Sequence, residues 1–163
     1  MAQLFALSAP DRIRNLLGRY CECIDAGDFA GVGALFARGE LAAGAVDAPA
    51  FVRGAEAIAA FYAEGAQLHD GSPRTKHVVA DIVFGEPAAD GTVVVRSSYV
   101  VHQAADGFPL QPLVAGRYVD TFAHDPDAAA DAAGTDGGWH FTRRHFDLDL
   151  VGDLSHHWAG PTG

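Results

Sequence analysis

The spacing of apolar residues along the chain changes at Ser72-Pro73, from the period of helices to the period of strands. Before Gly27, apolar side chains recur every three or four residues. This predicts an amphipathic helix that Ser8 or Asp11 caps at its start and Gly27 ends. The stripe that the helix would bury consists of Ile13, Leu16, Leu17, Tyr20 and Ile24.

Two further helices are predicted before the period changes. Asp28 can cap a short helix in FAGVGALFA, and residues 55–66 (AEAIAAFYAEGA) form the second, with an apolar side that includes Tyr62. Residues 39–50, between them, are rich in Ala and Gly and are expected to hold one short strand.

Four long runs after Ser72-Pro73 have the composition of β-strands, and they cover residues 74–86, 92–104, 110–124 and 139–151. Helices followed by a series of antiparallel strands predict an α+β fold, in which a curved sheet packs against the helices and encloses a concave pocket. We expect a single domain over residues 1–163. The Ala/Asp/Gly-rich stretch 124–138 is expected to be a mobile hairpin loop, and residues 159–163 a flexible tail.

The composition narrows the class of partner. The 163 residues carry a formal net charge of −10, which argues against nucleic acid because its phosphates would be repelled. No apolar run is long enough to span a membrane, and the N-terminus lacks the features of a signal peptide. Two cysteines, Cys21 and Cys23, are two residues apart on a predicted helix, where a mutual disulfide is implausible. These observations favour a reduced, cytoplasmic protein that binds a neutral, apolar small molecule.

His77 is the first candidate for chemistry, because it lies near the start of an apolar strand in SPRTKHVVADIVF. Strict alternation places it with Thr75, Val79, Asp81 and Val83, on the less apolar face of that strand. A position facing a pocket would therefore need a twist or a bulge. The alternative is a strand-end histidine that only satisfies a hydrogen bond.

Asp25 is the second candidate, because it lies at the end of the first predicted helix. A carboxylate there is unfavourable towards the helix dipole by roughly 0.3–1 kcal/mol, so it needs a partner, and a histidine would serve. The alternative is that Asp25, like Asp28, only shapes the turn.

Two later strands supply the remaining candidates. His102 shares a strand face with Val94, Arg96, Ser98 and Val100, whereas Tyr99 points to the other face, where it could offer a polar group on an apolar wall. AGRYVDTF contributes Arg117 and Tyr118 as candidates for substrate contact, although buried charges in such a stretch usually pair with each other.

Several chemistries find no support in the sequence. It contains no Gly-rich phosphate loop and no G-x-S-x-G elbow. The pairs His140 and His145, and His156 and His157, lack the spacing and companions of a zinc site. We therefore expect neither a metal nor a cofactor.

Five segments together resemble the SnoaL-like branch of the nuclear-transport-factor-2-like superfamily over nearly the whole chain. They are RYCECIDAGDFAGVGALFA, VRGAEAIAAFY, RTKHVVADIVF, AGRYVDTF and GGWHFTRRHFDLDLVGDLSHH. The resemblance implies a cone-shaped α+β barrel, in which three N-terminal helices pack on a strongly curved, mostly antiparallel sheet around a central pocket. It also implies a homodimer.

Two groups of enzymes in that superfamily resemble this chain at the candidate residues. Scytalone dehydratases have a similar Arg-Thr-x-His motif, which ends here at His77, and a similar His-Gln pair, which begins here at His102. Their helix-end aspartate matches Asp25. Hexachlorocyclohexane dehydrochlorinases are similar at Asp25 and His77, which there form a dyad. A tyrosine of the dehydratases is replaced by Ile24. We therefore include as candidate substrate contacts Tyr20, Ile24, Tyr62, Tyr99, Arg117 and Tyr118.

The resemblance predicts a cofactor-independent lyase, and a dehydratase first, that acts on a small hydrophobic cyclic or polyketide-like molecule. His77 would be the general base, Asp25 would orient it, and His102 would be a second acid–base group or a hydrogen-bond donor to the substrate. One alternative is an isomerase or cyclase with the same dyad. The other is a non-catalytic ligand-binding protein or the small subunit of an aromatic-ring dioxygenase.

Overall fold

The computed structural model describes residues 6–45, 47–129 and 134–159, and its elements follow the predicted order. The helices are α1 (Ala9–Ala26), α2 (Phe29–Leu35) and α3 (Ala55–Gly65). Two short strands, β1 (Glu40–Ala43) and β2 (Val52–Arg53), lie between α2 and α3; the first was predicted and the second was not. The long strands are β3 (Thr75–Phe84), β4 (Val93–Ala105), β5 (Phe108–His124) and β6 (Trp139–Val151).

The ends of the first helix follow from its capping residues. Ser8 is the N-cap of α1, and its hydroxyl and backbone exchange hydrogen bonds with Asp11, so the two predicted caps act together. Gly27 ends the helix in a left-handed conformation, at φ 75°. Asp28 then accepts a hydrogen bond from the N–H of Gly31 and caps α2. The tight turn places the last residues of α1 beside the start of β3.

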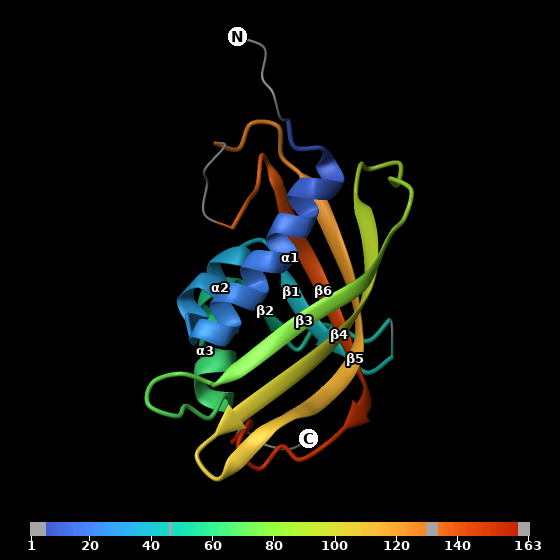
Figure 1. Ribbon diagram of the computed structural model, residues 1–163. Helices are drawn as coiled ribbons and strands as arrows, with labels where there is room; N and C mark the ends of the chain where they lie inside the picture. The colour runs from blue at the N-terminus through green and yellow to red at the C-terminus, as the bar shows by residue number, and fades with distance from the viewer. Residues whose placement is uncertain (1–5, 46, 130–133, 160–163) are drawn as a thin grey trace.

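The strands form one six-stranded sheet in the order β2-β1-β6-β5-β4-β3. Neighbouring strands are antiparallel except for β1 and β6, which are parallel. The sheet is bent along its long strands, and the three helices lie together on one side of it (Figure 1). This is the predicted α+β architecture. The core lies between the helices and the inner face of the sheet, and it includes the whole predicted apolar stripe of α1.

A β-bulge at Asp81 decides which side chains of β3 face inward. Asp81 has a φ of 51°, and the pairing with β4 shifts between Ala80 and Val83. Before the bulge, the less exposed residues of the strand are the odd-numbered ones, His77 among them; after it, they are Ile82 and Phe84. Strict alternation would place these two groups on opposite faces. The bulge brings both to the inner face.

The chain after β6 runs back under the ends of the strands towards α3 (Figure 1). We call residues 152–159 the C-terminal strap. Backbone hydrogen bonds join Gln67 to His157 and Ala159 to Gly65, at N···O distances of 2.9 and 2.8 Å. Of the tail predicted over 159–163, residues 160–163 lie outside the described residues.

Part of the loop predicted over 124–138 packs against α1. Residues 130–133 lie outside the described residues, but Asp136 is buried and accepts hydrogen bonds from Arg12, Asn15 and Arg19. Within the described residues, no helix is long and apolar enough to cross a membrane. Both cysteines are free thiols.

Candidate active site

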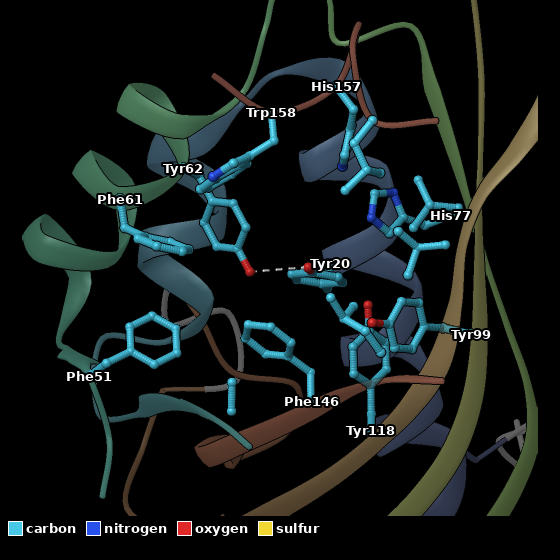
Figure 2. A pocket seen from close by; sticks show the side chains of 15 residues that line it. Tyr20, Phe51, Phe61, Tyr62, His77, Tyr99, Tyr118, Phe146, His157 and Trp158 are labelled. Carbon is cyan, nitrogen blue, oxygen red and sulfur yellow. Dashed lines mark hydrogen bonds between the residues drawn. The ribbon is translucent and has the colours of Figure 1, made fainter. Parts of the chain in front are cut away.

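A cavity of about 620 Å³ lies between the helices, the inner face of the sheet and the C-terminal strap. Its wall is mostly aromatic, and Figure 2 shows His77 and His157 on one side with Phe51 and Phe61 opposite them. Phe51 and Leu148 are 49% and 53% exposed although both line the cavity, so they mark its mouth. The remaining wall residues are Tyr20, Ala43, Tyr62, Tyr99, Val101, Val114, Tyr118, Phe146, Leu154 and Trp158.

Asp25 and His77 form a hydrogen-bonded pair at the cavity wall. The Nδ1 atom of His77 lies 2.6 Å from Oδ1 of Asp25. The same carboxylate accepts the backbone N–H of His77 at 2.9 Å and the hydroxyl of Thr75 at 2.9 Å. Both side chains of the pair are nearly buried, at 8% and 10% exposure. The first residues of β3 therefore supply the partner that the carboxylate at the end of α1 requires.

The surroundings of Asp25 determine which nitrogen of His77 carries the proton. Burial raises the pKa of Asp25, but the hydrogen bonds and charge of His77, with the hydroxyl of Thr75, outweigh it and leave this pKa below its ordinary value. An ionised carboxylate can only accept, so Nδ1 of a neutral His77 is the protonated nitrogen. Its Nε2 atom then holds a lone pair, and it has no hydrogen-bond partner among the described residues. The histidine ring lines the cavity, so this nitrogen is the one available to a ligand.

Four tyrosines contribute hydroxyl groups or ring faces to the wall. The hydroxyls of Tyr20 and Tyr62 lie 3.2 Å apart and share a hydrogen bond (Figure 2). Tyr99 and Tyr118 stack face to face with ring centroids 4.0 Å apart, and the Tyr99 hydroxyl donates to the carbonyl of Asp147. Burial raises the pKa of Tyr62, Tyr99 and Tyr118 above the ordinary value. These phenols are therefore protonated near neutral pH.

A buried ion pair between Arg144 and Asp120 packs against the tyrosines of the cavity wall. The guanidinium of Arg144 makes two 2.8 Å hydrogen bonds to Asp120, the residue directly opposite it on the neighbouring strand. Both side chains are fully buried. The Arg144 carbon Cζ lies 4.1 Å from the centre of the Tyr20 ring and 3.9 Å from that of Tyr118. The pair thus holds two wall tyrosines in place by cation–π contact.

The structure brings most of the sequence-predicted candidates together. His77 and Asp25 are paired, and Tyr20, Tyr62, Tyr99 and Tyr118 all line the cavity. Ile24 lies elsewhere: it is 6% exposed and belongs to the apolar core, outside the cavity wall. It follows Tyr20 by one helical turn and continues the buried stripe of α1.

The predicted roles of His102 and Arg117 do not fit their positions. Residues Tyr99, Val101 and Gln103 form the buried face of β4, and alternation turns His102 to the opposite face, away from the cavity. Arg117 lies on the outer face of β5, where it makes hydrogen bonds of 2.8–3.0 Å to Asp149. Neither side chain is in the cavity wall.

His157 is a cavity residue that the sequence did not indicate. It is partly buried, and burial together with the nearby His77 lowers the pKa of His157 from 6.5 to about 4. Its segment has neither helical nor strand periodicity, so no pattern could orient its side chain. Within the described residues, no group of three or more His, Cys, Asp and Glu could hold a metal ion.

Comparison with known proteins identifies a family and a fold. A family profile described as the SnoaL-like domain matches residues 6–145. A search of curated protein sequences found no match.

Several solved structures are similar to this one, at identities that establish the fold alone. ActVI-ORFA from Streptomyces coelicolor aligns at a TM-score of 0.67 and 20% identity, over 88% of this chain and all of that one. A candidate scytalone dehydratase from Novosphingobium aromaticivorans aligns at 0.61 and 20% identity, over 87% of this chain and 85% of that one. The beta subunit of a candidate aromatic-ring-hydroxylating dioxygenase from the same organism aligns at 0.63 and 20% identity, over 88% and 91%.

Proposed function

The chain belongs to the SnoaL-like domain family, and we propose that it is a cofactor-independent lyase, a dehydratase, that acts on a small hydrophobic cyclic or polyketide-like molecule. One observation carries the proposal. A histidine held by a carboxylate at 2.6 Å turns its second nitrogen towards an apolar cavity of about 620 Å³. A cavity of this volume and aromatic lining suits a neutral ring compound.

The chemistry follows from the fixed tautomer of His77. Nε2 removes a proton from a carbon next to a carbonyl group of the substrate, and the electron pair of that C–H bond forms a C=C bond. The C–O bond to a hydroxyl on the neighbouring carbon breaks, and the imidazolium returns its proton to the departing hydroxyl as water. Asp25 stabilises the imidazolium between these steps. The step conserves atoms and charge without a further reactant.

The test is turnover of cyclic β-hydroxyketones, followed by mass spectrometry for loss of one water. We expect His77→Ala and Asp25→Asn to lower the rate by about a hundredfold or more, because general base catalysis typically contributes that much. His102→Ala is the matched control, since its imidazole lies on the outer face of the same sheet. Circular dichroism would verify that each variant is folded. Wild-type turnover by folded His77→Ala would overturn the proposal.

The same dyad could instead serve an isomerase or a cyclase, in which the proton returns to carbon or a ring closes. Product mass separates these reactions from dehydration, because only dehydration loses water. The likeness to a dioxygenase beta subunit favours a second class, in which the chain is a subunit and the cavity is not catalytic. Co-purification with a larger iron-containing chain would support that class, and a homodimer measured by light scattering, as we expect, would count against it.

A further inference from the structure

The His-Gln pair on β4 contributes to this region through its glutamine, not through its histidine. Gln103 follows His102 and faces inward, where it is 1% exposed. Its Nε2 atom donates to the carbonyl of Pro73 at 2.9 Å and to the carbonyl of His156 at 2.8 Å. Two carbonyl oxygens can only accept, so this orientation of the amide is required. Gln103 therefore ties the C-terminal strap to the chain just before β3.

The carbonyl of His156 is held from a second direction as well. The Nε2 atom of His69 lies 2.8 Å from this oxygen, and the ring of His156 stacks on Phe108 with centroids 4.6 Å apart. The next residue along the chain is His157. Its backbone position is thus determined by two donors and a stacked ring, although it lies in a segment without regular secondary structure.

The side chain of His157 is placed as a ligand-binding group would be. Its ring lines the cavity on the same side as His77 (Figure 2). Its Nδ1 atom is buried and has no hydrogen-bond partner among the described residues. A ligand in the cavity cannot reach this buried atom, so it would bond to the other ring nitrogen, Nε2, which is not buried and has no hydrogen-bond partner among the described residues. Sites of this kind discriminate strongly against ligands that lack the matching group.

We propose that His157 is a substrate-binding residue that donates a hydrogen bond to an oxygen of the ligand beside His77, and that Gln103 is the positioning residue that holds it there. The inference rests on the proposed function in taking this cavity as the ligand site. The low pKa of His157 agrees with it, because the ring is neutral at pH 7 and either nitrogen can carry the proton. His77 cannot replace it as a donor, since its ring N–H and its backbone N–H are both bonded to Asp25.

A pair of probes separates the two histidines. The carbonyl oxygen of 1-tetralone can only accept a hydrogen bond, and tetralin has the same two rings without that oxygen. Calorimetry should show that the wild-type protein binds 1-tetralone more tightly than tetralin. In His157→Phe this preference should fall about fivefold or more, the typical contribution of one hydrogen bond, while tetralin affinity is kept. His157→Gln, which retains a donor, should restore part of the preference.

A second measurement does not depend on the folding of a His157 variant. In wild-type protein labelled with ¹⁵N-histidine, 1-tetralone should shift the ring nitrogens of His157 far more than tetralin does. Gln103→Met keeps the volume of the side chain but loses the donor. It should lower the tetralone preference and move the pKa of His157 up towards 6.5, because the ring gains access to water.

Three results would overturn the inference: an unchanged tetralone preference in His157→Phe, unshifted His157 nitrogens on binding, or no preference in the wild-type protein. Unaltered binding and an unaltered His157 pKa in Gln103→Met would overturn the positioning role alone. Each of these measurements reports binding. The lyase proposal is decided separately, by turnover in the His77 variant.

Discussion

The buried imidazole of His157 should make the folded protein sensitive to mild acid. The pKa of His157 falls from 6.5 to about 4 on folding, because burial and the neighbouring His77 both disfavour its charged form. Between these two values the unfolded chain binds more protons at this residue than the folded chain does. The free energy of unfolding therefore decreases as the pH falls below 6.5, and this contribution levels off near pH 4.

The size of the effect follows from the two pKa values. At about pH 5 the histidine of the unfolded chain is almost fully protonated, whereas about a tenth of the folded chain carries the proton. The difference lowers the stability by about 2 kcal/mol relative to about pH 8. In His157→Gln this loss should disappear, because glutamine does not titrate. The other titratable groups are common to both proteins, so the comparison isolates the contribution of residue 157, including its coupling to His77.

Urea unfolding of the two proteins at about pH 8 and about pH 5 measures this difference. His102→Gln is the matched control, because it removes an imidazole from outside the cavity, and the acid loss due to His157 should persist in it. If wild-type protein and His157→Gln lose the same stability between the two pH values, burial does not hold His157 neutral, and the reasoning is refuted.

Three further predictions concern the support of the site. Asp120→Asn leaves Arg144 as a buried cation without its counter-charge and should lower the free energy of unfolding, measured in urea, by about 3–5 kcal/mol. Asp125→Asn, at a surface ion pair, should lower it far less, and equal losses in the two variants would contradict the role of the buried pair. Gly65→Ala places a Cβ 2.0 Å from the Trp158 ring, so it should displace the C-terminal strap and red-shift tryptophan fluorescence, and an unchanged spectrum would count against that packing. Asp25→Asn should reduce the loss of stability below about pH 4. A carboxyl whose pKa is lowered by folding stabilises the folded protein above its unfolded pKa, and this contribution disappears as the pH falls through its folded pKa. An unchanged loss of stability below about pH 4 in the variant would contradict this role of Asp25.

The fold could be predicted from sequence because its signals are local. The stripe of α1 and the glycine at its end lie within one helix, and the period change at Ser72-Pro73 separates the helices from the long strands. The strand β2 has two residues, and a run that short carries no period. Asp25 was predicted to need a partner by the helix dipole, and the partner in the structure is His77.

The site was harder to predict, because only part of it follows from the local pattern and the rest depends on contacts distant in sequence. Alternation along β4 had already put Tyr99 and His102 on opposite faces, so both could not line one cavity, and the tyrosine does. Arg117 was a candidate only while its outer-face partner, Asp149, was unknown. The place of His157 depends on hydrogen bonds from Gln103 and His69, which no pattern within residues 152–159 reveals.

The bulge at Asp81 has a consequence for comparing and redesigning proteins of this shape. One inserted residue allows a single strand to serve two purposes, with His77 directed to the cavity and Ile82 and Phe84 directed to the core. Deleting that residue would restore strict alternation, and one of the two groups would have to turn outward. An alignment that closes this one-residue gap would therefore equate inward positions with outward ones. The strand acts as two half-strands of opposite phase, and either half can be redesigned only while the residue between them is kept.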